Sequence, residues 1–221
     1  MAATSSQRFR RWTFPVGLLQ CNCSVVADLA TRQAIVVDPG DNARRGDLDR
    51  ILALLDENQL TLVAIAITHA HIDHIGGAAG LQALRPAPVL LQPADEALYA
   101  MLDEQAAWIG LPPPPRVAIA APLGEGAPLA FGGYQLQVME TPGHTPGSVC
   151  LYLPDQSLLL AGDTLFAGSI GRTDLPGGDS QKILRSIHHK LLPLPEATLV
   201  VPGHGPETTI GAERRGNPFL A

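Results

Sequence analysis

Three histidines and a carboxylate occupy six positions in Thr68-His69-Ala70-His71-Ile72-Asp73-His74, directly after the apolar residues 62–67. Six consecutive apolar residues predict a buried strand. Side chains alternate in direction along an extended chain, so His69 and His71 are expected to project into the same space where this strand ends. Two imidazoles presented together are a common arrangement of metal ligands.

Asp73 and His74 follow where the chain is expected to turn into a helix near Ile75. The edge between a strand and a helix is where open α/β sheets usually place ligands and chemistry. A lone histidine at such a place would most simply be a satisfied surface residue. Four ligand-type side chains in the pattern H-x-H-x-D-H favour a functional metal site over that interpretation.

The composition is that of a globular protein. The chain has 221 residues, of which 46% are hydrophobic and 16% charged, so we expect one domain spanning residues 1–221. A formal net charge of −6 argues against a general nucleic-acid or anionic-membrane binder. We therefore expect a small-molecule substrate, no nucleic-acid or membrane partner, and a monomer or homodimer.

The cysteines and the N-terminal segment indicate a cytoplasmic location. Cys21, Cys23 and Cys150 are too few and wrongly spaced for a disulfide framework, so we interpret them as reduced, packed thiols. Arg10-Arg11 precede an apolar segment that superficially resembles an export signal, but this segment is short and Pro15 interrupts it. No segment reaches the length of a transmembrane helix.

Periodicity along the chain predicts strands and helices in two similar halves. Strands are expected at residues 12–16, 23–27, 34–37, 62–67, 89–91, 134–140, 149–153, 158–161 and 198–201, and helices at about 42–58, 94–109 and 180–191. Asp41 or Asn42 is expected to cap the first helix. Four prolines at 112–115 and the Gly- and Pro-rich residues 122–128 predict a surface crossover between the halves. This pattern predicts two mixed sheets packed face to face with helices outside.

Three more potential ligands lie in Gly-rich turns of the second half. His144 stands between two Pro-Gly turns, Asp163 follows Gly162, and His204 lies between two glycines. Each follows an expected strand. A Gly-flanked histidine or aspartate is by itself commonly just a turn residue. Their recurrence at strand ends favours coordination.

With these residues the chain resembles the metallo-β-lactamase superfamily, through Thr-His-Ala-His-Ile-Asp-His, Gly-His144-Thr, Gly-Asp163 and Gly-His204. The resemblance implies an α/β protein, a four-layer αββα sandwich of two mixed β-sheets with helices on the outer faces. It also implies two divalent metal ions, for which zinc is favoured and iron or manganese also fits. By position, the implied ligands are His69, His71 and His144 for one ion, Asp73, His74 and His204 for the other, and Asp163 bridging both.

Within the superfamily the chain is most similar to short forms of glyoxalase II, the hydroxyacylglutathione hydrolases. Matching stretches run from Asn22-Cys23-Ser24 to Asn217-Pro218-Phe219. Longer members carry a C-terminal helical domain that helps to bind glutathione, whereas this chain stops at Ala221. Pro206 also stands where longer members have a glutathione-contacting tyrosine. The resemblance implies cleavage of S-D-lactoylglutathione or a related acyl thioester, without that second domain.

The resemblance also implies roles for three residues. Two neighbouring divalent ions activate water for attack on an acyl carbonyl at neutral pH, so Asp73 and Asp163 are the expected catalytic residues, with Asp73 also orienting the water. Arg172, nine residues after Asp163, occupies the place of a basic residue that contacts glutathione. A structural ion pair between Arg172 and Asp174 is the alternative.

Other functions compete with thioester hydrolysis. The persulfide dioxygenases resemble the chain through Gly-Arg-Thr-Asp and use one iron on the same histidines, but the turn around His204 fits the hydrolases better. A hydrolase for another ester is a further alternative. A non-catalytic binding module would lack one or more ligands, and none is missing. The β-lactam hydrolases are disfavoured because they lack an aspartate at the bridging position.

Overall fold

A six-stranded sheet forms the first layer of strands in the computed structural model, which describes residues 8–41 and 46–220. Its spatial order follows the sequence: β1 (Phe9–Val16), β2 (Cys21–Asp28), β3 (Gln33–Val37), β4 (Thr61–Ala66), β5 (Val89–Leu91) and β6 (Ile119–Pro122). The first three strands pair antiparallel, and β3 to β6 pair parallel. The H-x-H-x-D-H stretch follows β4, at the edge where the parallel strands end.

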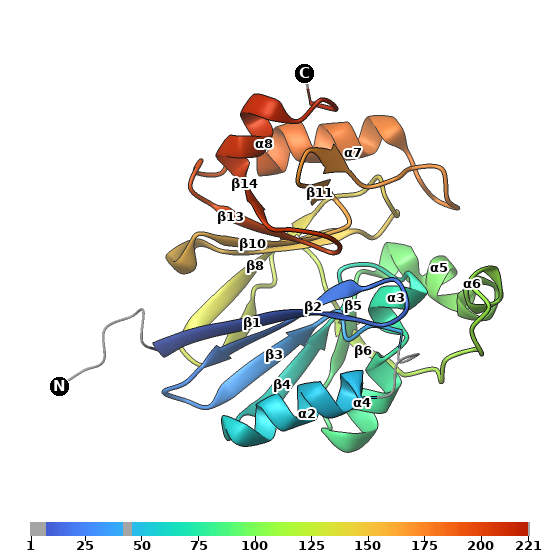
Figure 1. Cartoon of the computed structure of the whole chain (residues 1–221), viewed down its shortest axis with the longest axis vertical. Coiled ribbons are helices and arrows are strands. Elements are labelled where there is room, and N and C mark those ends of the chain that lie inside the picture. Colours follow the sequence, from blue (N-terminus) through green and yellow to red (C-terminus); the bar gives the residue numbers. More distant parts are fainter. Residues whose placement is uncertain (1–7, 42–45, 221) are drawn as a thin grey trace.

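A second six-stranded sheet faces the first (Figure 1). Its spatial order is β14 (Thr208–Thr209), β13 (Leu199–Pro202), β10 (Leu158–Gly162), β9 (Val149–Leu153), β8 (Tyr134–Glu140) and β7 (Leu129–Phe131). β10 and β13 pair parallel, whereas the other pairs are antiparallel. Both sheets are therefore mixed, as predicted. A separate hairpin joins β11 (Leu165–Phe166) to β12 (Ser169–Ile170).

Helices cover the outer face of each sheet (Figure 1). Those packed on the first sheet are α2 (Asp47–Glu57), α3 (Ile72–Ile75), α4 (Ala78–Leu84), α5 (Glu96–Ala100) and α6 (Leu102–Trp108). The second sheet carries α7 (Ser180–Ser186), which continues into a wider π-helical turn at Ile187–Leu191, and α8 (Ile210–Gly216). Short 3₁₀ turns lie at Pro93–Asp95 and Pro154–Gln156.

Three apolar layers hold the sandwich together. The middle layer lies between the sheets, where Ile35 and Ala64 of the first sheet pack in one cluster with Leu136 and Leu151 of the second. Two outer layers lie between each sheet and its helices. Burial of these apolar side chains supplies the main driving force for the assembly. The αββα sandwich expected from the sequence is thus the observed fold.

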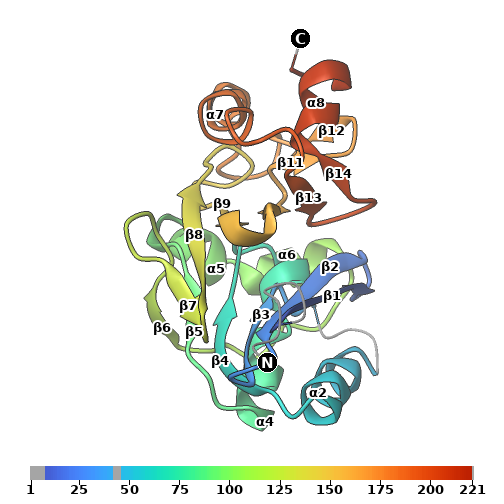
Figure 2. The ribbon, with the colours of Figure 1, turned by 90° about the vertical axis from the view of Figure 1, so that its left-hand side faces the viewer.

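The chain passes from β6 to β7 at one side of the sandwich, through the Gly- and Pro-rich residues that predicted a crossover (Figure 2). The four prolines do not lie in this crossover, contrary to the prediction, because they precede β6 of the first sheet; the residues from them to Ala118 form neither helix nor strand. No helix in the described parts of the chain is long and apolar enough to cross a membrane.

The single helix predicted over residues 94–109 is wrong, because α5 and α6 are separated at Met101. The carbonyl of Leu98 accepts a tight-turn hydrogen bond from Met101 N at 3.1 Å and another from Gln105 Nε2 at 2.9 Å. These two donors withdraw that carbonyl from the regular helical pattern. The helical segment is therefore bent around a buried glutamine.

Two other helix boundaries differ from those expected. The helix expected from about residue 42 begins at Asp47, with Gly46 at its N-cap in a left-handed conformation. Asp41 therefore does not cap it, and Asn42 lies outside the described residues. The helix expected near Ile75 is instead the single turn α3, and α4 begins separately after Gly77. A Cβ on Gly77 would lie 2.6 Å from the carbonyl oxygen of Pro39, so close backbone approach requires glycine there.

Candidate metal centre

One loop and one helical turn present the first four potential ligands. His69 and His71 leave the end of β4, and His71 stands in extended conformation just before α3. Asp73 and His74 then lie in the first turn of α3. All four residues are at most 8% exposed, so their polar atoms face one another and not bulk water.

The other three potential ligands come from three separate strand ends of the second sheet. His144 follows β8, Asp163 follows β10 and His204 follows β13. Gly143, with a φ of 144°, lies against the backbone of Ile183, where a Cβ would meet the amide nitrogen at 2.2 Å. Only glycine can therefore make the turn that presents His144.

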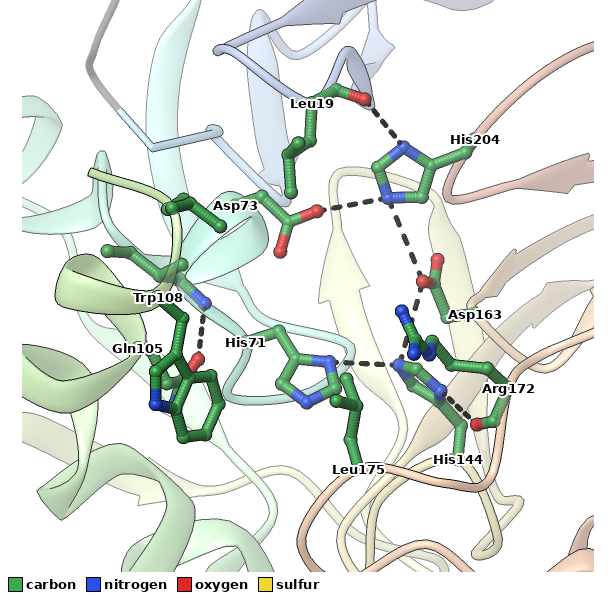
Figure 3. Close-up of a pocket in the computed structure, with 12 residues that line it drawn as sticks. Leu19, His71, Asp73, Gln105, Trp108, His144, Asp163, Arg172, Leu175 and His204 are labelled. Atoms are coloured by element: carbon green, nitrogen blue, oxygen red, sulfur yellow. Dashed lines mark hydrogen bonds and ion pairs between the residues drawn. The ribbon is translucent and has the colours of Figure 1, made fainter. Parts of the chain in front are cut away.

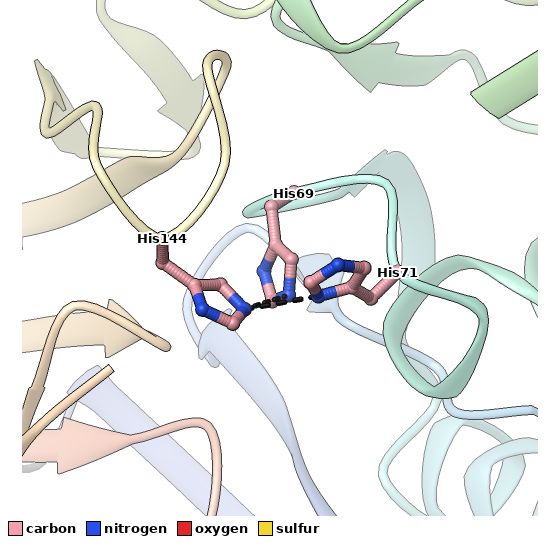
Figure 4. Close-up of side chains that lie close together, drawn as sticks. All are labelled: His69, His71 and His144. Carbon is pink, nitrogen blue, oxygen red and sulfur yellow. Dashed lines mark hydrogen bonds between the residues drawn. The ribbon is translucent and has the colours of Figure 1, made fainter. Parts of the chain in front are cut away.

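His69, His71 and His144 form a first cluster (Figure 4). Nε2 of His144 lies 2.9 Å from Nδ1 of His71 and 3.2 Å from Nε2 of His69. Three buried imidazole nitrogens that converge in this way could hold a divalent transition-metal ion.

Asp73, His74 and His204 form a second cluster beside it. Nε2 of His204 lies 3.1 Å from Oδ2 of Asp73 and 3.3 Å from Nε2 of His74. Nε2 of His74 and Oδ2 of Asp73 are 3.7 Å apart. The His204 side chain is 27% exposed, so this cluster is the more open of the two.

The carboxylate of Asp163 lies between the clusters. Its Oδ1 is 3.5 Å from Nε2 of His74, and its Oδ2 is 3.6 Å from Nε2 of His144 and 3.7 Å from Nε2 of His204. Oδ1 is buried and has no hydrogen-bond partner among the described residues. A buried carboxylate oxygen without a hydrogen bond is costly unless a cation pairs with it, so this oxygen fits a divalent metal ion.

Outer partners fix four of the imidazoles with Nε2 towards the clusters. Metal-binding histidines usually donate their other ring N–H in this way. Thr68 donates its hydroxyl to Asp38, so its oxygen is left to accept from His69. The four Nδ1 partners are Thr68 Oγ1 for His69 (3.1 Å), Asp38 Oδ2 for His74 (2.9 Å), the carbonyl of Arg172 for His144 (2.8 Å) and the carbonyl of Leu19 for His204 (3.1 Å).

The His71 ring has the opposite orientation, with Nδ1 instead of Nε2 towards the cluster. Its Nδ1 faces His144 at 2.9 Å, and its Nε2 is buried with no hydrogen-bond partner in the described part of the chain. Burial, and then the nearby His144, lower the pKa of His71 to about 3. The ring is therefore neutral, as a metal ligand must be.

Burial and neighbouring charges together set the protonation states of the potential ligands. Burial, and then the surrounding histidines, lower the pKa of His69 well below its ordinary value. Burial acts to raise the pKa of Asp73, but the charges of His74 and His204 outweigh it and the pKa is lowered. Burial acts to lower the pKa of His74 and of His204, but nearby acidic groups outweigh it and both pKa values are raised. The first cluster thus offers neutral imidazoles, and the positive charge of the second stands where a divalent cation would replace it.

Three residues that frame the H-x-H-x-D-H loop were not found from the sequence. Asp38 Oδ1 accepts from Thr68 N at 2.8 Å, while its Oδ2 accepts from Thr68 Oγ1 and from His74. Asp95 and Gln105 approach from the other side of the loop. In the sequence, Asp38 looks like a turn residue after a strand, and no local signal distinguishes a buried aspartate from an exposed one.

Asp95 connects the loop that carries His69 and His71 to the turn that carries His144. Its Oδ2 accepts from Ala70 N and from Thr145 Oγ1, both at 2.9 Å, and its Oδ1 accepts from Gly147 N at 2.6 Å. Gln105 accepts from Ile72 N at 2.9 Å and donates to the carbonyl of Ala70 at 3.2 Å. These two buried side chains satisfy backbone groups of a ligand loop that forms no regular ladder.

Arg172 lies at the rim of the site. Its guanidinium pairs with Asp174 through Nε to Oδ1 at 2.7 Å and Nη2 to Oδ2 at 2.8 Å, so the structural ion pair weighed from the sequence is formed. Its side chain is 61% exposed and also lines the cavity described below. The backbone carbonyl of the same residue positions His144.

The three cysteines are buried free thiols. Burial, partly offset by the nearby His74, raises the pKa of Cys21 to about 12, and burial raises that of Cys150 to about 11. Cys21 Sγ lies 3.5 Å from Nδ1 of His74, behind the ring and away from the second cluster. As protonated thiols these residues suit packing. The remaining histidines, His188 and His189, are exposed on the π-helical turn.

A cavity of about 410 Å³ opens beside both clusters (Figure 3). Polar atoms of the two clusters occupy its floor. Its lining residues are Leu19, His71, Ile72, Asp73, Gln105, Trp108, Ile109, His144, Asp163, Arg172, Leu175 and His204.

Comparisons with known proteins agree with this architecture. The sequence model of the metallo-beta-lactamase superfamily matches residues 16–204. Hydroxyacylglutathione hydrolase GloC of Haemophilus influenzae is 36% identical over 93% of this chain and 95% of its own. The di-iron-bound form of TTHA1623 has a TM-score of 0.83 and 41% identity, covering 95% of this chain and 100% of that chain. BLEG-1 B3 metallo-beta-lactamase has a TM-score of 0.86 and 39% identity, covering 96% and 99%.

Proposed function

This chain belongs to the metallo-beta-lactamase superfamily, and we propose that within it the protein is a thioester hydrolase of the glyoxalase II type that uses two divalent metal ions. Its substrate is S-D-lactoylglutathione or a related acyl thioester, which it cleaves to an acid and a thiol. The resemblance of the chain to GloC, a hydroxyacylglutathione hydrolase, supports this substrate class.

The observation that carries the proposal is the position of Asp163. Its Oδ1 faces His74 of the second cluster, and its Oδ2 lies between His144 of the first cluster and His204 of the second. Two donor sets that share a carboxylate are the arrangement of a two-metal hydrolase. In this proposal His69, His71 and His144 would hold one ion, Asp73, His74 and His204 the other, and Asp163 would bridge them.

Such ions would supply Lewis-acid activation of water and of a substrate carbonyl. The chain's own residues would orient the water and hold the donor atoms in position. Asp73 lines the cavity with an ionised carboxylate and can orient a water beside the scissile carbonyl. A thiolate leaves readily, so the reaction needs no strong general acid. Outer hydrogen bonds to the imidazoles keep the donor atoms in place through the reaction.

The ligand set suits zinc, iron and manganese, and metal availability decides which is bound. The di-iron form of TTHA1623 makes iron a candidate beside zinc. We therefore propose to purify the protein without chelator, measure its metal content, and reload it separately with zinc, iron and manganese.

Each loaded sample is then offered S-D-lactoylglutathione, a small neutral thioester, glutathione persulfide with oxygen monitoring, and a β-lactam. The β-lactam is included because BLEG-1 is named a B3 metallo-beta-lactamase. We expect thioester cleavage with two metal ions bound per chain. Oxygen uptake with untouched thioesters would replace the proposal by a dioxygenase, and β-lactam cleavage alone would replace it by a lactamase.

A further inference from the structure

One wall of the cavity beside the ligand clusters is apolar. It consists of Leu19, Ile72, Trp108 and Ile109, and we call it the apolar wall. Leu19 lies in the turn between β1 and β2, Ile72 begins α3, and Trp108 ends α6. Figure 3 shows the side chains of Leu19 and Trp108 on the same side of the cavity as Asp73, opposite Arg172.

Two members of the apolar wall are unusually exposed. Leu19 is 45% and Trp108 52% exposed, and both rank among the few large apolar side chains at the described surface with this much exposure. Exposed apolar groups gathered at a cavity, beside polar groups that can do chemistry, mark a ligand-binding surface. The wall adjoins Asp73, so a group lying on it would be attached close to the reacting carbonyl.

The charges around the cavity also favour an apolar substrate group. Arg172 is the only arginine or lysine among the described residues that line it, and its guanidinium is already paired with Asp174. Asp73 and Asp163 add negative charge to the floor. A thiol with several carboxylates therefore finds little compensating charge beyond the metal ions, whereas an apolar group loses nothing on leaving water.

We propose that the preferred substrate is a thioester with an apolar group of several carbon atoms, and that this group lies on the apolar wall. The inference rests on the proposed function, and it assigns Trp108 as a specificity-determining residue. The apolar group belongs to either the acyl part or the thiol part of the thioester, since both flank the same carbonyl.

Two substrate series distinguish these arrangements. One contains acetyl, butanoyl, hexanoyl and octanoyl thioesters of N-acetylcysteamine, and the other contains acetyl thioesters of alkyl thiols of matching length. We expect kcat/KM to rise about threefold per methylene in one series until the wall is covered, and to exceed kcat/KM for S-D-lactoylglutathione. A flat dependence in both series, or a preference for the glutathione thioester, would overturn the inference.

Failure of the inference can be told from failure of the proposed function. If the metal-loaded protein cleaves no thioester, the proposed function is wrong. If it cleaves the acetyl thioesters but ignores chain length, the hydrolase stands and only the inference fails.

Trp108→Ala tests the wall directly. Its effect is expected to grow with chain length and to reach about a tenfold loss of kcat/KM for the longest substrate, chiefly through KM. Leu84→Ala is the matched control, because Leu84 is 51% exposed at the end of α4 and does not line the cavity. Equal losses for short and long substrates in Trp108→Ala, at unchanged metal content, would contradict the assignment.

Discussion

The two halves of the candidate metal centre are built by different means. In the N-terminal half a single loop and helical turn present His69, His71, Asp73 and His74, and buried side chains hold that loop by hydrogen bonds. In the C-terminal half three separate turns each present one residue, and glycines packed tightly against neighbouring backbone or side chains shape them. Buried polar partners are therefore the main support of the first half, and tight packing at glycines is the main support of the second.

This difference has a physical origin. Four potential ligands in one short loop leave its backbone polar groups without ladder partners, so other parts of the chain must satisfy them. A turn at the end of a strand has its backbone already ordered by the sheet. Such a turn needs only a backbone conformation that glycine permits and a position where no Cβ would collide with its neighbours.

Asp163→Ala removes the carboxylate that lies between the two clusters, and we expect it to lower activity more than any other change considered below. It removes negative charge next to both clusters at once, so we expect kcat/KM to fall by more than about 100-fold with loss of bound metal. Metal analysis and thioester kinetics measure both quantities. Asp155→Ala, at an exposed position in a 3₁₀ turn, is the control. A variant that keeps two ions and turns over normally would refute the bridging role of Asp163.

Gly203→Ala tests the packing in the C-terminal half. An added Cβ would lie 2.0 Å from Oδ1 of Asp163 and 2.8 Å from Cε1 of His74, so one of these side chains must move. We expect about 1–3 kcal/mol less unfolding free energy and a kcat/KM lowered by about 100-fold. Denaturant unfolding and kinetics measure these. Gly216→Ala, where no atom lies within 4 Å of the added Cβ, should change neither; the packing argument fails if both variants behave alike.

Asp95→Asn tests the buried hydrogen bonds that support the N-terminal loop at Ala70 and connect it to Thr145 and Gly147 of the C-terminal half. The carboxylate accepts three hydrogen bonds, whereas an amide must turn its NH₂ group towards at least one donor. We expect metal affinity to fall by about 10-fold to 100-fold while the protein stays folded. Titration of the apoprotein with zinc, together with circular dichroism, checks this. Unchanged affinity would show that these hydrogen bonds do not position the loop.

Arg172→Ala probes a residue of the C-terminal half whose side chain lies outside the clusters. Its guanidinium is exposed and paired, so we expect only a severalfold rise of KM for glutathione thioesters, with kcat nearly unchanged. A small neutral thioester is the matched comparison and should be affected little. If both substrates suffer equally, Arg172 acts only through the fold.

Replacing Cys21, Cys23 and Cys150 together by Ala should have the smallest effect on turnover. The thiols are buried and protonated at neutral pH, and the proposed reaction needs no protein nucleophile. We expect kcat within about twofold of the parent once the variant is metal-loaded. Complete loss of turnover in a folded, metal-loaded variant would indicate a covalent acyl intermediate.

The sequence predicts the fold and the grouping of potential ligands well, because both depend on local patterns. Long apolar strands such as β4 and β9 are visible in short windows, and His69 to His74 are adjacent in the chain. The short edge strands β6, β7 and β14 escape prediction because, unlike the similarly short β5 with its run Val89-Leu90-Leu91, they show neither a run of large apolar residues nor a readable alternation. Assignment of the seven residues as metal ligands remains a prediction.

The frame of the site could not be predicted. Asp95 follows Pro93 and looks like a helix-capping residue, yet its side chain turns inward to bind two distant loops. Gln105 looks like a residue of an ordinary helix, yet its amide interrupts that helix at Leu98. Both roles depend on which loops the finished fold brings together, which no local pattern records.

The turn between β1 and β2 connects substrate contact to the geometry of His204. The side chain of Leu19 faces the cavity, while its carbonyl accepts from His204. The amides of Gly17 and Leu18 are fastened to the carboxylates of Asp47 and Asp41 at 2.6 and 2.7 Å. Two hydrogen bonds therefore hold the turn in place next to Leu19. If substrates lie on the apolar wall as we infer, a group too bulky for it would push Leu19 and move the carbonyl that accepts from His204, so poor fit would misalign that imidazole.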